Sequence, residues 1–240
     1  MVSIIILVHG AYIYTKNTIE TLQNTKGNYE IIVLDNDSDK KTKRLLLKLQ
    51  EKGYIDKLIY SKTNTLFAKG NNIASGLCSK ESDKIVLLNS DIDIRNKDWL
   101  EEMLKIHEKG ITSLGAVIGN PWTRADGYCF MIDRELYDKY KLDEEFKWWW
   151  SITKLQALVL KSGYKVKAVK NHENLLFHYG GMSGNDFQNA KGMKVEKDTV
   201  KKWFKDKNIE IIEEIKSENT VYNNNSKANR MYRKQKKNKS

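Results

Sequence analysis

The stretch that decides the fold is the run Val2-Ser3-Ile4-Ile5-Ile6-Leu7-Val8 at the start of the chain. Nearly every position in it is apolar or β-branched, which is typical of a strand buried on both faces of a sheet. A second such run, Ile85-Val86-Leu87-Leu88, lies further along the chain. Both runs are far shorter than the roughly 18 apolar residues of a membrane helix. They therefore predict sheet strands and no membrane span.

Helical and extended patterns alternate around these two runs. Strands are expected at residues 2–8, 29–34, 57–60, 84–88 and 114–118, and helices at residues 15–24, 39–50, 68–77, 96–108, 195–204 and 209–215. Repeated strand–helix units of this length favour a mostly parallel sheet with right-handed crossovers. The predicted fold class is therefore α/β, with a mostly parallel central sheet flanked by helices.

The length and composition of the chain agree with a packed core. The chain has 240 residues, of which 40% are hydrophobic and 30% charged, and this length suits one large domain or at most two small ones. Cys78 and Cys129 each lie beside apolar residues, which predicts reduced core thiols rather than a disulfide framework. No basic region and cleavage site accompany the first apolar run, so we expect a cytoplasmic protein without a secretory signal.

The positive charge is concentrated at the end of the chain. Seven of the eleven net charges fall in residues 221–240, which contain no acidic residue. Because this segment also has few apolar residues, it cannot bury enough surface to offset the entropy lost on ordering. We therefore predict a folded domain over residues 1–218 and a disordered basic tail over residues 219–240. The tail can be merely solubilising, or it can bind RNA, an acidic partner or an anionic membrane surface, which would make the protein peripheral at a membrane.

Polar side chains collect where the predicted strands end. Asp35 and Asn36 follow the second strand, and Asn89, Asp91 and Asp93 follow the fourth. In such sheets, ligands bind beyond the carboxyl ends of the strands. The sequence contains neither the glycine fingerprint of dinucleotide-binding folds nor a P-loop. Carboxylate and amide oxygens suit Mg²⁺ or Mn²⁺, which can bridge diphosphate oxygens and neutralise a departing nucleotide. The sequence is thus compatible with a metal-dependent nucleotide-diphosphate site.

Four ordered blocks of sequence resemble the family 2 glycosyltransferases with the GT-A fold, a Rossmann-like fold of nucleotide-diphospho-sugar transferases. The blocks are VSIIILV at 2–8, YEIIVLDNDS at 29–38, NTLFAKGNN at 64–72 and LLNSD at 87–91, and the likeness extends to about residue 180. The resemblance implies transfer of a sugar from a nucleotide-diphosphate sugar to a hydroxyl of a glycan or other acceptor, with inversion at the anomeric carbon. Asn89-Ser90-Asp91 stands at the family's Asp-x-Asp motif, in the asparagine-first form of relatives that resemble rhamnosyltransferases.

The resemblance also implies which residues bind the donor. They are Val8, Asp35, Asn36, Lys69, Gly70, Asn72 and Asn89. Val8 and Asp35 would lie around the nucleobase, with the Asp35 carboxylate accepting a base N–H. The competing interpretations are an ordinary turn carboxylate for Asp35 and a solvated helix residue for Lys69.

Three residues are candidate ligands for the metal ion. Asp91 is the first, by its place in the motif. Asp93 completes a second Asp-x-Asp, and a strand would point both carboxylates the same way. His178 matches a late histidine that completes metal coordination in many relatives, although a single histidine is usually structural.

One departure from the family concerns the general base. Relatives carry an acidic pair about a dozen residues before the glycine that is Gly163 here, but the corresponding positions are Ser151 and Ile152. A positioned base contributes about 10²–10⁴-fold in rate. Nearby acids that can replace the pair are Asp126, Asp143, Glu144 and Glu145. Alternatively, the metal and the electrostatics of the site supply most of the acceleration, or the chain binds a nucleotide sugar without transferring it.

Asp126 and a run of three tryptophans each allow two interpretations. The resemblance makes Asp126 a candidate contact to sugar hydroxyls, and the alternative is a turn residue that opens a strand. Trp148-Trp149-Trp150 cannot all face one side of a helix, so at least one ring should lie on the cleft or on a partner surface. Because aromatic rings stack on apolar sugar faces, Trp149 and Trp150 are candidates for an acceptor platform. Packing of the following helix against the sheet is the alternative.

Two other classes of protein compete with a transferase. A nucleic-acid-binding protein would use the basic tail and exposed aromatic rings, but the carboxylates at the strand ends would repel phosphates without a metal, so no nucleic acid is expected. A catalytically silent nucleotide-sugar-binding protein would keep the resemblance and explain the missing acidic pair. Donor binding without turnover would identify this second class.

Overall fold

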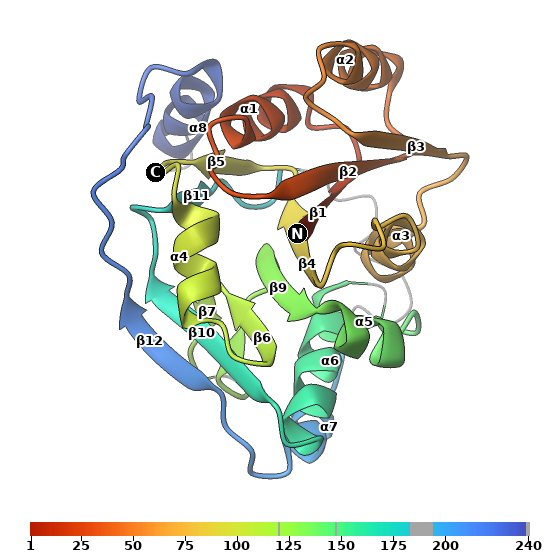
Figure 1. Ribbon diagram of the computed structural model, residues 1–240, viewed down its shortest axis with the longest axis vertical. Helices are drawn as coiled ribbons and strands as arrows, with labels where there is room; N and C mark the ends of the chain where they lie inside the picture. The colour runs from red at the N-terminus through yellow and green to blue at the C-terminus, as the bar shows by residue number, and fades with distance from the viewer. Residues whose placement is uncertain (120, 147, 183–193, 239–240) are drawn as a thin grey trace.

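The structure is a computed structural model that describes residues 1–119, 121–146, 148–182 and 194–238. Its main sheet contains β1 (Val2–Val8), β2 (Tyr29–Asn36), β3 (Lys57–Ser61), β4 (Lys84–Asn89), β6 (Gly110–Ser113), β9 (Cys129–Asp133), β10 (Lys165–Asn171) and β12 (Glu210–Glu214). The strand order is β12-β10-β6-β9-β4-β1-β2-β3 (Figure 1). Strand β9 is antiparallel to its neighbours β4 and β6, and the other pairs are parallel. The prediction of an α/β fold with a mostly parallel sheet is confirmed.

Helices cover both faces of the main sheet. One face carries α1 (Tyr12–Leu22), α2 (Lys40–Glu51) and α4 (Trp99–Ile106), and the other carries α3 (Leu66–Ser75), α5 (Arg134–Tyr140), α6 (Trp149–Lys161) and α7 (Lys197–Phe204). Successive residues of β1 alternate between these layers: Ile4 and Ile6 pack in the first core and Ile5 in the second. All three side chains are fully buried. This explains why the run is apolar at almost every position, since both faces of the strand are covered.

Two short antiparallel sheets complete the fold near the carboxyl ends of the central strands. One pairs β5 (Ile92–Ile94) with β11 (Leu176–His178), and the other pairs β7 (Ala116–Val117) with β8 (Arg124–Ala125). The chain reverses between β4 and β5, where the Thr18 hydroxyl of α1 donates to the carbonyl oxygens of Ser90 at 2.9 Å and Ile92 at 2.8 Å. This turn brings the end of β4 beside β11, which comes almost 90 residues later in the chain.

Residues 209–215 contain the strand β12 (Glu210–Glu214), so the prediction of a helix there is wrong. Strand β12 pairs in parallel with β10 at the edge of the main sheet. Its consecutive residues Ile211 and Ile212 pack against opposite cores, as side chains of a strand do. A short apolar run fits either structure by its pattern alone, and in this protein the free edge of β10 favours the strand.

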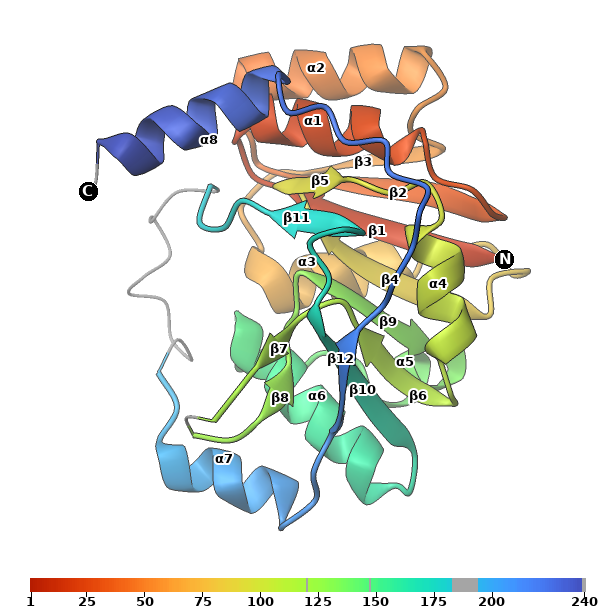
Figure 2. The same cartoon turned by 90° about the vertical axis from the view of Figure 1, so that its left-hand side faces the viewer.

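The end of the chain also differs from the predicted disordered tail. Helix α8 (Lys227–Lys237) begins after Ser226, whose hydroxyl accepts from the backbone N–H of Asn229 at 3.1 Å. Ala228 and Asn229 are buried, and Figure 2 shows α8 beside α1 with its far end extending beyond the body. The composition of the tail does not predict this helix, because α8 packs against residues from other segments, such as Tyr14 and Tyr179. The division of the chain at residue 218 stays a prediction.

Two further predictions concern the cysteines and membrane spans. Cys78 and Cys129 are buried free thiols, as predicted. No helix in the described part of the chain is long and apolar enough to cross a membrane.

Candidate functional site

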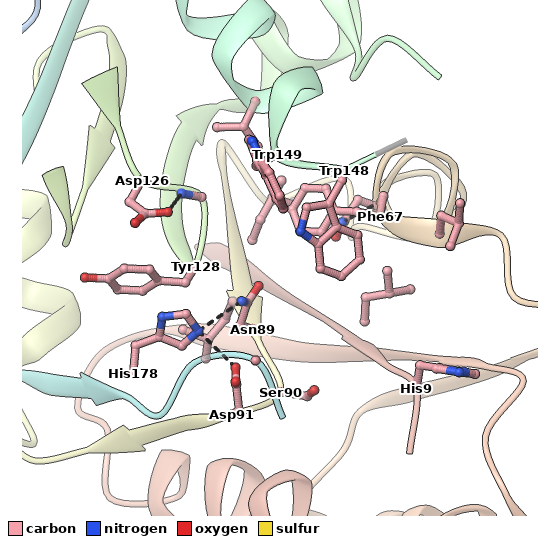
Figure 3. A pocket seen from close by; sticks show the side chains of 18 of the residues that line it. His9, Phe67, Asn89, Ser90, Asp91, Asp126, Tyr128, Trp148, Trp149 and His178 are labelled. Carbon is pink, nitrogen blue, oxygen red and sulfur yellow. Dashed lines mark hydrogen bonds and ion pairs between the residues drawn. The ribbon is translucent and has the colours of Figure 1, made fainter. Parts of the chain in front are cut away.

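A cavity of about 510 Å³ lies where the strands β1, β2 and β4 end (Figure 3). The strand ends contribute His9, Asn36 and Asn89 to its wall, and Asp91 follows in the turn after β4. The beginnings of α3 and α6, the segment 124–128 and His178 of β11 form the remaining walls. The cavity therefore lies at the edge of the sheet where the sequence predicted a ligand.

Asn89, Asp91 and His178 form a polar cluster on one side of the cavity. Nε2 of His178 lies 3.2 Å from Oδ1 of Asp91 and 3.3 Å from the Asn89 amide nitrogen. The Asp91 side chain is only 4% exposed, and the backbone N–H of Met182 approaches its Oδ2 at 3.5 Å. The structure thus brings together three of the predicted site residues, although His178 is 89 positions from Asn89 in the sequence.

The ring of Tyr128 packs against the imidazole ring of His178. The two rings stack with their centroids 4.3 Å apart. The Tyr128 hydroxyl donates to Nε2 of His172 at 2.5 Å, while Nδ1 of His172 lies 3.2 Å from the carbonyl oxygen of Lys170. Burial lowers the pKa of His172, which favours the neutral imidazole that this arrangement requires. The hydrogen bond to His172 therefore holds the hydroxyl end of the tyrosine whose ring stacks on His178.

The cluster suits a metal ion that is shared with a phosphorylated ligand. Among the residues that the structure describes, no three His, Cys, Asp or Glu side chains are grouped as a metal site. Asp91 nevertheless offers a carboxylate, His178 an imidazole nitrogen and Asn89 an amide, and all three line the cavity. Such a donor set suits Mn²⁺ or Mg²⁺ only if oxygens of a ligand or water complete the coordination.

Asp93 points away from this cluster. It is not among the residues that line the cavity. Its Oδ1 accepts from Asn17 Nδ2 at 2.9 Å and its Oδ2 from Asn229 Nδ2 at 3.1 Å. The prediction that Asp91 and Asp93 point the same way assumed one continuous strand, but Asp91 lies in the turn between β4 and β5. Of the two carboxylates, the structure places Asp91 alone at the cavity.

Aromatic rings form the side of the cavity that faces the polar cluster (Figure 3). Phe67, Trp148 and Trp149 line it, with the rings of Phe67 and Trp148 edge to face at a centroid distance of 6.0 Å. Trp149 is 42% exposed at the start of α6. Trp150 is not a lining residue and packs partly buried against the second core. Of the two tryptophans predicted as an acceptor platform, only Trp149 lines the cavity. The second tryptophan on this wall is Trp148 and not the predicted Trp150.

Asp126 is the other carboxylate on the cavity wall. Its Oδ1 accepts from the backbone N–H of Gly127 at 2.7 Å. Ile152 of α6 also lines the cavity and packs against this turn, since a Cβ on Gly127 would lie 3.2 Å from its Cγ1. Ser151 is buried, and its hydroxyl donates to the carbonyl oxygen of Trp148 at 2.7 Å. Ile152 stands where the resemblance predicts one acid of the pair. Its apolar side chain thus lies next to the turn that contains Asp126.

The remaining candidate bases lie outside this cavity. Glu144 accepts from the amide of Asn72 at 3.1 Å and lines a separate hollow together with Lys69. Glu145 is not a lining residue of either space. Asp143 forms an ion pair with Lys154. Asp126 is therefore the candidate base that the structure places at the cavity.

Asp35 and Val8 lie side by side at the ends of β2 and β1, fully buried, and neither of them lines the cavity. Oδ1 of Asp35 accepts from the backbone N–H of Ser38 at 3.2 Å, whereas Oδ2 has no hydrogen-bond partner among the described residues and lies 3.9 Å from Lys43 Nζ. Burial raises the pKa of Asp35. A buried carboxylate oxygen without a donor is costly, and the N–H of a ligand would relieve that cost.

Asn36, at the end of β2, lines the cavity and holds the loop between β3 and α3. Its Oδ1 accepts from both the backbone N–H and the hydroxyl of Thr65 at 2.8 Å, and its amide donates to Asn64 at 2.8 Å. Asn36 therefore shapes the wall as well as offering polar atoms to a ligand.

Lys69, Gly70 and Asn72 of α3 do not line the main cavity. Lys69 is exposed. Gly70 lets α3 approach the sheet, because a Cβ there would lie 2.5 Å from Cδ1 of Leu7. Asn72 joins α3 to α5 and to the segment after it: its Oδ1 accepts from the Tyr137 hydroxyl, and its amide donates to the carbonyl oxygen of Leu142 at 2.8 Å. The structure gives Gly70 and Asn72 packing roles.

The lining residues that were not predicted as site residues include His9, Arg124, Tyr128 and Trp148. His9 follows directly after the first strand, so its position gave a usable signal. The other three come from segments that only the tertiary structure places at the cavity.

The chain is similar in sequence and in structure to known proteins. The profile of "Glycosyl transferase family 2" matches residues 3–187. No curated protein sequence matches the chain.

Three solved structures illustrate the structural likeness. The mannosyltransferase PcManGT from Pyrobaculum calidifontis in complex with GDP-Man and Mn²⁺ has a TM-score of 0.60 at 14% identity, over 71% of this chain and 55% of that one. Residues 1–349 of TarS from S. aureus have a TM-score of 0.57 at 15% identity, over 85% of this chain and 69% of that one. GalNAc-T7 with UDP, GalNAc and Mn²⁺ has a TM-score of 0.56 at 12% identity, over 69% of this chain and 41% of that one. The chain thus spans about half the length of the first of these proteins, and the likeness shows a common fold.

Proposed function

Because the chain belongs to glycosyl transferase family 2, we propose that it transfers a sugar from a nucleotide-diphosphate sugar to an acceptor hydroxyl, with inversion at the anomeric carbon. One observation carries the proposal. The Asn89–Asp91–His178 cluster and the Trp148–Trp149 wall face each other across one cavity at the carboxyl ends of the strands. The polar side suits a diphosphate with a cation, and the aromatic side suits a sugar.

The donor would bind along the strand ends. The unpartnered Oδ2 of Asp35 would accept a nucleobase N–H. Asp91, His178 and Asn89 would hold Mn²⁺ or Mg²⁺ together with the diphosphate. The bound cation would neutralise the charge that develops on the departing nucleoside diphosphate. Two of the structurally similar transferases contain Mn²⁺, which supports this part of the proposal. The asparagine-first motif supports a rhamnosyl-type donor.

Asp126 is the proposed general base. Its carboxylate would take the proton of the acceptor hydroxyl while that oxygen attacks the anomeric carbon and the nucleoside diphosphate leaves from the opposite face. Two contacts support this role: Asp126 lines the cavity, and Ile152, at a position where relatives carry an acid, packs on the adjacent Gly127. The acceptor, a glycan or another hydroxyl compound, would lie against Trp149.

A catalytically silent donor-binding protein is the second candidate. Ser151 and Ile152 favour it, because neither side chain can take a proton from an acceptor. The two candidates differ in turnover and share donor binding.

Turnover is therefore the experiment that tests the proposal. Purified protein is incubated with UDP-, GDP- and dTDP-sugars, including dTDP-rhamnose, with Mn²⁺ or with EDTA, and released nucleoside diphosphate is quantified with and without a mixture of glycan acceptors. Metal-dependent release from one donor, rising with acceptor, supports the transferase. Saturable donor binding with no release under any condition supports the silent protein. If no donor binds, both candidates fail.

The basic helix α8 supports a further proposal on location, namely peripheral binding to an anionic membrane surface from the cytoplasm. All six basic residues of this helix are exposed: Lys227, Arg230, Arg233, Lys234, Lys236 and Lys237. Each basic residue near an anionic surface contributes about 1 kcal/mol. Sedimentation with phosphatidylserine vesicles at low salt, but not with phosphatidylcholine vesicles, is the expected result. Equal sedimentation with both, or binding only to RNA, would contradict the proposal.

A further inference from the structure

The C-terminal helix is attached to the body through a buried polar residue, Asn229. This side chain is 4% exposed and lies in the first turn of α8. Its amide nitrogen donates to Oδ2 of Asp93 at 3.1 Å and to the carbonyl oxygen of Asn223 at 2.9 Å. Its amide oxygen accepts from the hydroxyl of Tyr179 at 3.0 Å. Asn229 thus uses both ends of its amide to join α8 to two separate segments of the fold.

Aromatic packing surrounds this polar contact. The ring of Tyr232 in α8 packs against Phe177 and Tyr179, with centroids 5.4 Å and 5.3 Å away. Tyr179 also packs on Tyr14 of α1 at 4.9 Å, and the Tyr14 hydroxyl donates to Gln235 Oε1 at 3.1 Å. These rings shield the Asn229 amide from water, which makes its hydrogen bonds stronger and their loss more costly.

The two segments that Asn229 joins are the ones that carry the proposed metal ligands. Asp93 belongs to β5 and follows Asp91 by two residues, and Tyr179 follows His178 directly in the chain. The backbone N–H of Tyr179 donates to the carbonyl oxygen of Asp91 at 3.0 Å. In the β5–β11 pair, Asp93 is aligned with Phe177. Asn229 therefore bridges the two backbone segments from behind, on the side away from the cavity.

Asp93 depends on this bridge for half of its hydrogen bonding. The Asp93 side chain is 3% exposed. Asn17 donates to Oδ1, and Asn229 donates to Oδ2. The Arg95 guanidinium lies 3.7 Å from Oδ2, but its Nε makes no hydrogen bond to it. Without Asn229, a buried carboxylate oxygen would lose its donor, and β5 would be expected to shift in order to recover one.

We infer that Asn229 of α8 is a positioning residue for the metal–diphosphate site: it fixes Asp93 and Tyr179, and through them the relative position of Asp91 and His178. The inference rests on the proposed function, which gives Asp91 and His178 their role. The inference gives the C-terminal helix a role in the donor site. Residues that hold metal ligands in position commonly change metal affinity about 10–100-fold when they are replaced.

The test compares full-length wild type with Asn229→Leu, which keeps the branched shape of the side chain and removes both polar ends of the amide. Lys234→Ala is the matched control, because Lys234 lies on the exposed face of the same helix. Tyr179→Phe is the milder variant, which keeps the packed ring and removes only its hydroxyl. Two readouts are measured: amide hydrogen exchange of residues 89–95 and 175–182 without ligand, and the Kd of Mn²⁺ alone from the paramagnetic resonance of the free ion.

In Asn229→Leu we expect exchange at least tenfold faster in both segments and a Kd for Mn²⁺ raised about 10–100-fold, with smaller changes in the same direction in Tyr179→Phe. Lys234→Ala should match the wild type in both readouts. Unchanged exchange in Asn229→Leu and Tyr179→Phe would overturn the inference. Faster exchange with an unchanged Kd would also overturn it, because Asn229 would then be structural only.

The two proposals fail in different ways. If wild-type protein does not bind Mn²⁺, the metal site of the proposed function is refuted, and the inference about that site falls with it. If wild type binds Mn²⁺ and Asp91→Ala does not, the metal site stands, and the Asn229 variants then decide the inference alone. If Asn229→Leu does not fold, as judged by circular dichroism, Tyr179→Phe decides it.

Discussion

Replacing Asp126 by Asn tests the proposed general base. The change is nearly isosteric, and the Asn side-chain oxygen can still accept the 2.7 Å hydrogen bond from the Gly127 N–H. The turn should therefore keep its shape, and only the ability to take a proton is lost. A positioned base contributes about 10²–10⁴-fold, so we expect kcat to fall by that factor, which corresponds to about 2.7–5.4 kcal/mol in activation free energy. Asp126 is outside the Asn89–Asp91–His178 cluster, so the Kd of the donor should change by less than about threefold.

The assay is release of nucleoside diphosphate at saturating donor and acceptor. Glu144→Gln is the matched control, because Glu144 lies outside the main cavity, and its kcat should equal that of the wild type. A kcat of Asp126→Asn within threefold of wild type would refute the assignment, as would a large loss in Glu144→Gln.

Three further predictions concern the acceptor wall, the buried carboxylate and the contact between α3 and the sheet. Trp149→Ala should raise the acceptor KM about 2–10-fold and leave the donor Kd unchanged, because a stacked ring contributes about 0.5–1.5 kcal/mol; an equal loss in donor affinity would contradict the placement of the acceptor. Asp35→Asn should weaken donor binding at least tenfold and yet stabilise the apo protein at pH 7, as measured by Tm. Burial raises the pKa of Asp35, so its contribution to stability is present at low pH and lost as the pH rises through the folded-state pKa; the Tm difference should therefore shrink towards pH 3, and a variant that is less stable at pH 7 would refute this reasoning. Gly70→Ala should lower the free energy of unfolding by about 1–3 kcal/mol in a urea titration, because the added Cβ would lie 2.5 Å from Leu7 Cδ1; a neutral effect would show that α3 can move away from β1.

Local patterns in the sequence were sufficient to predict the centre of the fold. The runs that became β1 and β4 are apolar on both faces, and helical periodicity separates the strands, so each element could be recognised without its partners. The segment 209–215 could not be assigned in this way. Its apolar residues fit a helix or a strand, and the deciding factor was the free edge of β10, which is distant in the sequence.

The candidate site was predictable to the extent that strand ends determine it. Asp91 and Asn36 follow strands and line the cavity as expected. Asp93 was misjudged because its direction depends on a tight turn and on Asn229, a partner 136 residues away. The same long-range contact explains α8. Its composition predicts disorder, and the surface that orders it consists of Tyr14, Tyr179 and their neighbours from other segments.

The central claim is that Asp91 holds a divalent cation against the diphosphate of a donor. The most direct measurement is calorimetric binding of UDP, GDP and dTDP to the full chain with Mn²⁺ and with EDTA, for the wild type and Asp91→Ala. Asp198→Ala, which removes an exposed carboxylate on α7, is the control. The account predicts that one nucleotide binds wild type and Asp198→Ala only with Mn²⁺, and that Asp91→Ala binds it at least 100-fold more weakly, a loss of about 2.8 kcal/mol. Equal affinity with EDTA, or an Asp91→Ala variant that binds as the wild type does, would contradict it.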